Sequence, residues 1–209
     1  MKLYTYPPAP NPKRLDIFLA EKGIDLETEL VDLMSKEHLS EPYTLINSWG
    51  TVPALVLDDG MVMTEVIGIL SYLEDLYPEK PLMGTDPLSR ALVLSWDHRC
   101  FSEGFLAVAE VLRNSAPAFA GRSLPGPVSY EQIPQLVERG KKRIQTFYSV
   151  LNQHLDGRDF MVGDHFTIAD IAAFVFIEFS GWVKARIPDD CASLIAWHQQ
   201  VSTRNSTQN

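Results

Sequence analysis

The chain has 209 residues, of which 45% are hydrophobic and 22% are charged, a composition that excludes disordered and fibrous proteins. Acidic residues outnumber basic ones by 27 to 18, and the net charge of −9 argues against binding of nucleic acid. No apolar run approaches the roughly 18 residues that span a bilayer, and the N-terminus has no signal-type apolar core, so we expect a cytoplasmic protein without membrane association.

Two cysteines, Cys100 and Cys191, lie far apart in the chain, with neither CxxC spacing nor a neighbouring cluster of histidines. The sequence therefore predicts neither a metal site nor a dithiol redox centre. We expect both cysteines to be small, buried hydrophobic residues.

The first eighty residues predict alternating strands and helices. The segment KLYTY is rich in aromatic residues and ends at a proline, which is typical of a strand. Leu15, Phe18 and Leu19 repeat at helical spacing until Gly23, a residue type that commonly ends helices. The later segments are LETELVDL as a second strand, SKEHLSEPYTLINSWG as a weak helix broken by Pro42, PALVL and MVM as a hairpin, and TEVIGILSYLEDLYP as an amphipathic helix. The predicted order is β-α-β-α-β-β-α.

Strand signals fade after the segment PEKPLMGTDP, and helical patterning takes over. We therefore predict an α/β domain over residues 1–79, a linker over 80–86 and an all-α domain over 87–209. Helices of the second domain are expected at about residues 86–116, 129–155, 167–180 and 190–203.

The segment GDHFTIADIAAF predicts the start of a core helix. Thr167 stands three residues before Asp170. The Thr167 side chain can therefore cap N–H groups of the first helical turn, while the Asp170 carboxylate reaches back toward Thr167. Phe166 and Ile171 flank this capping box as a hydrophobic staple. We expect the motif to have a structural role.

In combination, these segments resemble the cytosolic glutathione S-transferases. AEKGI, TVPAL, TEVIGILSYLEDLYP and GDHFTIADI occur in the order and spacing of that family, over essentially the whole chain. The resemblance implies a thioredoxin-like βαβαββα domain followed by an all-helical domain. It also implies an enzyme that uses glutathione as co-substrate without a metal, acts on small hydrophobic electrophiles and forms a homodimer.

Val52 and Pro53 mark the centre of the implied glutathione site. The resemblance implies a cis peptide between them and a Val52 backbone that pairs with an extended tripeptide in the manner of an added strand. The alternative is that Pro53 only begins a strand, where proline is tolerated.

The ends of glutathione are assigned by the same resemblance to Glu65, Val66 and His38. Glu65 matches the acidic residue that holds the γ-glutamyl end, and Val66 replaces the usual serine, leaving its N–H as a donor at a helix N-terminus. Glu65 could instead only complement the helix dipole. His38 resembles a histidine that approaches the glycyl carboxylate, although it could equally be a loop residue without a ligand.

A proline-rich corner follows the first strand, with prolines at positions 7, 8, 10 and 12. Family members stabilise the glutathione thiolate here with Tyr, Ser or Cys, and none of these stands plainly in its usual place. We predict Asn11 as N-cap and Pro12 as the first residue of a helix whose N-terminus holds the sulfur. Asn11 or nearby N–H groups would stabilise the thiolate, with Tyr6 or Thr5 as alternatives, and Asn11 could also be a plain helix cap.

The leading hypothesis is a glutathione transferase that joins the thiolate to small hydrophobic electrophiles. One alternative is a glutathione-dependent peroxidase or isomerase on the same scaffold. Another is a non-catalytic protein that binds glutathione or a hydrophobic ligand, since the usual thiol activator and the serine at position 66 are missing.

Overall fold

The computed structural model describes residues 1–208, which form two compact units. The first unit holds residues 1–80 together with residues 124–130, and the second holds residues 81–123 and 131–208. The first unit contains 6 of the 18 basic and 14 of the 27 acidic residues, so most of the chain's net negative charge lies there.

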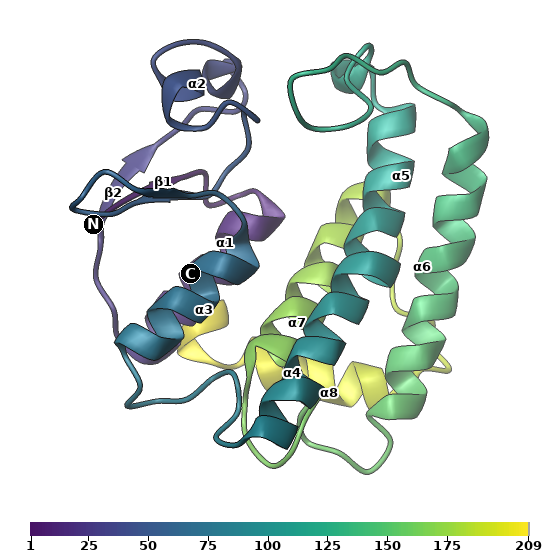
Figure 1. The fold of residues 1–209 in the computed structure, drawn as a ribbon. Helices are drawn as coiled ribbons and strands as arrows, with labels where there is room; N and C mark the ends of the chain where they lie inside the picture. Colours follow the sequence, from purple (N-terminus) through teal and green to yellow (C-terminus); the bar gives the residue numbers. More distant parts are fainter. Residues whose placement is uncertain (209) are drawn as a thin grey trace. The chain divides into compact units, whose positions relative to one another are not determined.

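The first unit is a four-stranded mixed sheet with helices on both sides. Its strand order is β2-β1-β3-β4, with β1 parallel to β2 and antiparallel to β3. Figure 1 shows α1 and α3 on one face of the sheet and α2 on the other. This is the expected thioredoxin-like arrangement. The elements are β1 (Lys2–Thr5), α1 (Pro10–Lys22), β2 (Glu27–Leu30), η1 (Glu37–Leu39), α2 (Tyr43–Ile46), β3 (Ala54–Val56), β4 (Val62–Met63) and α3 (Val66–Leu76).

Helix α1 begins two residues earlier than the sequence predicts. Its N-cap is Ala9, with extended backbone and no side-chain cap, and Pro10 is the first helical residue. Asn11 is therefore not the N-cap but the second residue of the helix. A proline in the first turn loses no hydrogen bond, because the first N–H groups of a helix have no partner within it. At the other end Gly23 has a φ of 70° and ends the helix, as predicted.

The core of the first unit lies between the sheet and the α1/α3 face. Leu3, Leu15, Phe18, Ile69 and Leu73 are fully buried there. Such burial supplies about 25 cal/mol of stabilisation for each Å² of apolar surface removed from water.

A buried ion pair joins the C-terminal ends of α1 and α3. Lys22 Nζ lies 2.8 Å from a Glu74 carboxylate oxygen, and both side chains are almost wholly buried. The same ammonium donates hydrogen bonds to the carbonyls of Tyr77 at 2.7 Å and Lys80 at 2.8 Å. The pair therefore holds the C-terminal ends of the two helices together on one face of the sheet.

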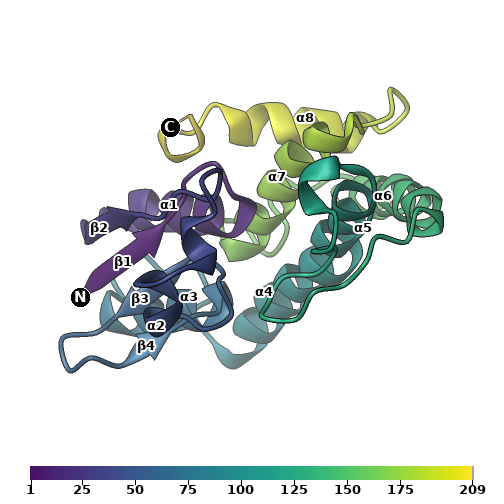
Figure 2. The same cartoon turned by 90° about the horizontal axis from the view of Figure 1, so that it is seen from above.

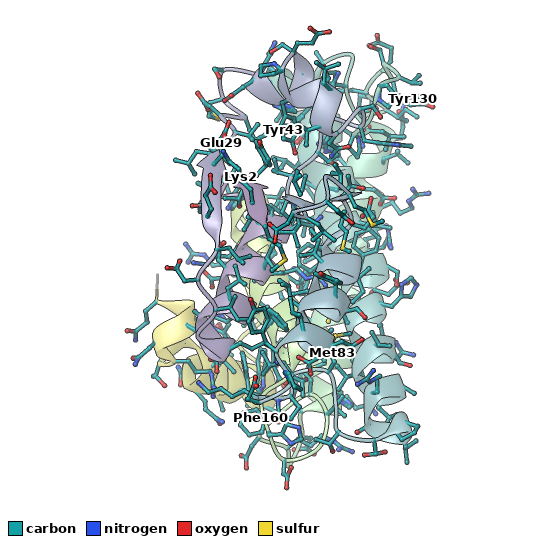
Figure 3. All side chains as sticks on the ribbon, turned by 60° about the vertical axis from the view of Figure 1, so that its left-hand side comes forward. Lys2, Glu29, Tyr43, Met83, Tyr130 and Phe160 are labelled. Atoms are coloured by element: carbon teal, nitrogen blue, oxygen red, sulfur yellow. The ribbon has the colours of Figure 1, made fainter. Side chains whose placement is uncertain are left out.

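At the edge of the sheet, Lys2 of β1 bridges two residues of β2. Its Nζ lies 3.2 Å from Glu27 and 2.7 Å from Glu29, which stand on the same face of the strand because side chains alternate. Figure 3 labels Lys2 and Glu29 beside each other.

The second unit is entirely helical, and Figures 1 and 2 show α8 crossing the long axes of α6 and α7. A single helical run covers residues 87–115, and its middle six residues are π-helical. Helix α6 begins later than the pattern predicts, because Pro134 precedes its first residue. The elements are α4 (Pro87–Arg99), the π-segment η2 (Cys100–Phe105), α5 (Leu106–Ser115), η3 (Pro117–Phe119), α6 (Gln135–His154), α7 (Ile168–Ser180), η4 (Gly181–Val183), α8 (Ala192–Ser202) and η5 (Asn205–Thr207). Within residues 1–208, no helix combines the length and apolar character that a membrane crossing requires.

The capping box predicted at Thr167 and Asp170 opens α7. Asp170 is fully buried and accepts hydrogen bonds from the N–H of Thr167 at 2.9 Å, the N–H of Met161 at 2.8 Å and Nε1–H of Trp197 at 3.3 Å. Burial raises the pKa of Asp170 to about 6, against the opposing effect of these donors. The motif has the structural role expected of it.

Candidate functional site

The predicted site residues of the first unit gather at one end of the two central strands, where β1 finishes and β3 begins. This end of the sheet is called the edge of the site below. Tyr4 stands opposite Ala54 in the β1–β3 pair, so continuing that register brings Thr5 and Tyr6 beside Pro53 and Val52. Val52 shares a buried cluster with Tyr6 and Ala9. The corner between β1 and α1 therefore adjoins the segment before β3.

The start of α3 lies at the same edge. Leu55 stands opposite Met63 in the β3–β4 pair, so the chain that follows β4 runs beside Ala54 and Pro53. Glu65 is the N-cap of α3, with an exposed side chain that makes no cap hydrogen bond, and Val66 is the first helical residue. The N–H groups of this first turn have no acceptor inside the helix, which makes it suited to a carboxylate.

Val52 offers unpaired backbone groups at the centre of this edge. The Val52–Pro53 peptide is cis, as the resemblance implies, and the Glu41–Pro42 peptide is cis as well. Within residues 1–208 neither the N–H nor the C=O of Val52 has a hydrogen-bond partner. A ligand with an extended backbone could pair with both groups.

His38 lies in η1, and Gly50 fixes that turn against the segment before β3. Gly50 has a φ of 59°, and a Cβ at this position would lie 2.7 Å from the carbonyl oxygen of His38. Only glycine combines this backbone conformation with so close an approach. His38 is half-buried. The turn that carries it contacts Gly50, which precedes Val52 by two residues in the chain.

Asn11 retains free donors at the start of α1. The N–H of Ala9 donates to Tyr6 and the N–H of Lys13 donates to Ala9, while the prolines at 10 and 12 have no N–H. Asn11 Oδ1 accepts a hydrogen bond from Arg14 Nη1 at 3.3 Å, and neither its amide NH₂ nor its N–H has a partner within residues 1–208. These donors stand at the positive end of the α1 dipole.

Thr5 and Tyr6 lie at the C-terminal end of β1 beside this corner. Thr5 is 3% exposed, and its Oγ1 has no hydrogen-bond partner in the described part of the chain. Tyr6 is half-buried and packs in the cluster with Val52. The structure thus brings together all three residues predicted to act on a thiol.

Two charged residues of α1 were not singled out by the sequence. Arg14 is only 2% exposed, and Asp16 is partly buried, which raises its pKa to about 6 against the opposing charge of Lys13. In a sequence, a charged residue between the apolar positions of a helix is predicted to face solvent. No pattern in the sequence therefore indicated that these two side chains are buried. No cluster of His, Cys, Asp or Glu suited to a metal occurs among residues 1–208.

Comparison with known proteins points to one family. Residues 9–76 match the model of the glutathione S-transferase N-terminal domain, and residues 131–208 match that of the C-terminal domain. The chain is 28% identical to glutathione S-transferase 2 of Saccharomyces cerevisiae, over 100% of this chain and 88% of that protein. It is 33% identical to a probable maleylacetoacetate isomerase of Caenorhabditis elegans, over 81% of this chain and 74% of the relative. The crystal structure of a glutathione S-transferase domain-containing protein of Marinobacter aquaeolei superimposes with a TM-score of 0.89, at 31% identity, over 99% of this chain and 100% of that one.

Proposed function

Since this chain is an enzyme of the cytosolic glutathione S-transferase superfamily, we propose that it joins the thiolate of glutathione to small hydrophobic electrophiles. The observation that carries the proposal is the convergence at one sheet edge of three features. They are the unpaired backbone of Val52, the N-terminus of α3 and the donor-bearing N-terminus of α1.

Glutathione would bind in an extended conformation along this edge. Its γ-glutamyl carboxylate meets the N–H of Val66, and its ammonium meets the carboxylate of Glu65. Its central residue pairs with the backbone of Val52 beside Pro53, and its glycyl carboxylate lies toward His38. Three separate anchors fix the position of the sulfur.

The sulfur would then lie at the proline-rich corner. The N–H and the amide NH₂ of Asn11 donate to the thiolate, and the dipole of α1 favours its negative charge. The hydroxyls of Thr5 and Tyr6 are the alternative donors. The thiol proton leaves to solvent, the sulfur forms a bond to the electrophilic carbon, and the leaving group departs with its electron pair.

The first test is the ultraviolet difference absorbance of the bound thiolate across a range of pH. A free thiol has a pKa of about 8.5, and we expect a pKa lower by one to two units, roughly 1.4 kcal/mol each, in the complex. Asn11→Ala should return the pKa toward the free value and lower kcat, because it removes the amide donors. Thr5→Val and Tyr6→Phe are the matched comparisons.

Three outcomes contradict parts of this proposal. Binding without a shift of the thiol pKa favours a carrier over a transferase. If the pKa of the bound thiol in Asn11→Ala equals that in the unmodified chain, and the pKa is raised in Thr5→Val or Tyr6→Phe, the hydroxyl removed by that substitution is the group that stabilises the thiolate. No binding of glutathione overturns the proposed site altogether.

A glutathione-dependent isomerase is the second candidate, and the similarity to a probable maleylacetoacetate isomerase favours it. Isomerisation also begins with attack by the thiolate, but the sulfur is released again and no conjugate accumulates. Turnover of an aryl halide and of a cis-configured dicarboxylic enone, followed by product analysis, distinguishes the two reactions.

A homodimer is proposed as the working form. Each unit exposes apolar side chains of the kind that subunit interfaces cover, including Met61 and Ile67 in the first unit and Leu88 and Leu92 in the second. Sedimentation equilibrium tests the assembly. A monomer at micromolar concentration contradicts it.

A further inference from the structure

We propose that Asn47 is a positioning residue of the glutathione site, because its side chain fixes the peptide plane that carries the N–H of Val52. Asn47 would not touch glutathione; it would act through Thr51. The inference rests on the proposed function and adds to it a residue that determines affinity for the tripeptide backbone.

Asn47 is 2% exposed and uses both ends of its amide within one short loop. Its Nδ2 donates to the carbonyl of Thr51 at 2.8 Å and lies 3.0 Å from the hydroxyl oxygen of the same residue. Its Oδ1 accepts from the N–H of Trp49 at 3.1 Å. Its backbone adds a bond from its N–H to Tyr43 and one from the N–H of Gly50 to its carbonyl, both at 2.9 Å. One side chain therefore determines the path of the loop from residue 47 to residue 51.

A second buried donor acts on the same carbonyl. The hydroxyl of Tyr43, a residue 2% exposed, also donates to the Thr51 oxygen. Tyr43 is the first residue of α2, and its ring centroid lies 6.0 Å from that of Tyr4 in β1, so the side chain faces the sheet. Burial raises the pKa of Tyr43 to about 12, so it remains a neutral donor at physiological pH. Both lone pairs of the Thr51 carbonyl are thus directed into the interior.

The geometry of the peptide group carries this constraint to Val52. The carbonyl of Thr51 and the N–H of Val52 belong to one planar group and point in opposite directions when that group is trans. Two buried donors on the carbonyl therefore direct the N–H away from the interior. Val52 N–H is the group left without a partner within residues 1–208, at the position where the tripeptide backbone would pair.

The experiment compares Asn47→Asp with the unmodified chain by titration calorimetry. The substitution keeps the size and the acceptor of the side chain but removes both N–H donors. The two ligands are glutathione and an analogue in which the carbonyl of the cysteinyl residue is replaced by a methylene group, so that the N–H of Val52 has no acceptor. We expect the Kd for glutathione to rise about tenfold, equivalent to the loss of one hydrogen bond, and the Kd for the methylene analogue to change less than about twofold.

Kinetics gives a second readout that general loosening of the fold would not reproduce. The KM for glutathione should rise with little change in kcat at saturation, and the pKa of the bound thiol should be unchanged, because the α1 corner is untouched. Asn114→Asp is the matched control. Asn114 is a buried residue of the second unit that also uses both ends of its amide, at 2.8 Å to the carbonyl of Glu110 and 2.8 Å from the N–H of Ile133.

Equal weakening of both ligands, or no weakening of either, overturns the inference while leaving the proposed function in place. Failure of the unmodified chain to bind glutathione overturns both. If Asn47→Asp does not fold, Tyr43→Phe replaces it, since this substitution removes one of the two donors to Thr51 and keeps the ring. It should raise the Kd for glutathione two- to threefold and spare the analogue, and equal effects on both ligands would again contradict the inference.

Discussion

At the scale of single residues, the candidate site depends on backbone groups more than on side chains. Val52 offers an N–H and a carbonyl, Val66 offers only an N–H, and Asn11 adds a single side-chain amide. This explains why sequence motifs can propose a place for the site in the fold but do not identify its chemistry. The orientation of a backbone group is set by neighbours such as Asn47 and Tyr43, whose contacts do not follow any spacing in the sequence.

Gly50 should be the glycine of the first unit that tolerates substitution least. Gly50→Ala adds a methyl group 2.7 Å from the His38 carbonyl and places a side chain at φ 59°, so we expect a loss of at least 2 kcal/mol in unfolding free energy, roughly the sum of the two effects. Glutathione affinity should fall with it, because the loop to Val52 moves. Chemical denaturation and calorimetry measure the two effects.

Gly60 provides the control for this prediction. It also has a positive φ, of 87°, but a Cβ there would meet no atom within 4 Å. Gly60→Ala should therefore cost about 1 kcal/mol and leave glutathione binding unchanged. Equal losses in the two variants would show that the close contact with His38 has no effect.

At the scale of elements, hydrophobic periodicity predicted the type and order of the helices and strands, and turn chemistry predicted some of their ends. The predicted helix end at Gly23 and the predicted capping box at Thr167 and Asp170 are confirmed, because each depends only on residues of one helical turn. The predicted start of α1 was wrong. Pro10, Asn11 and Pro12 are all residue types that favour the first turn of a helix, so local preferences do not determine which of them begins it. The π-segment at Cys100–Phe105 was not predicted, because the helical periodicity that runs through it does not distinguish an α-helical turn from a π-helical one.

The ion pair between α1 and α3 gives a prediction for these elements. Lys22→Met leaves the Glu74 carboxylate buried without its cation, so unfolding free energy should fall by about 3–5 kcal/mol. The double variant Lys22→Met/Glu74→Leu should recover part of that loss, because no unpaired charge remains, while the carbonyls of Tyr77 and Lys80 still lack the ammonium donor. Urea denaturation of the three proteins measures the difference, and a double variant as unstable as the single one would contradict this account.

At the scale of the whole molecule, stability should depend on pH through one aspartate in each unit. Asp16 and Asp170 both have a pKa raised to about 6 by burial, compared with about 3.9 in an unfolded chain. The folded state then binds more protons than the unfolded state between these values. Unfolding free energy should accordingly fall as pH rises from about 4 to about 6, by at most about 3 kcal/mol for fully buried Asp170 and by less for partly exposed Asp16.

Denaturation at several pH values tests this slope. Asp16→Asn keeps the shape of the side chain without a titrating group, so it should flatten the part of the slope due to the first unit. Asp16 makes no hydrogen bond with the rest of residues 1–208, so the substitution breaks none and removes only the charge attraction between Asp16 and Lys13. A slope that is the same in Asp16→Asn and in the unmodified chain would show that Asp16 does not bind a proton in this range.

The uneven distribution of charge between the two units affects how quickly a ligand arrives. Glutathione carries a net negative charge at neutral pH, and the unit that would bind it has more than twice as many acidic as basic residues. Repulsion acts over about 10 Å at 0.1 M salt, beyond the reach of any hydrogen bond in the site. Encounter is therefore slowed at low ionic strength and becomes faster as salt screens the unit, the reverse of electrostatic steering. Affinity in this protein must come from contacts made after arrival, and slow release rather than rapid capture would keep glutathione bound.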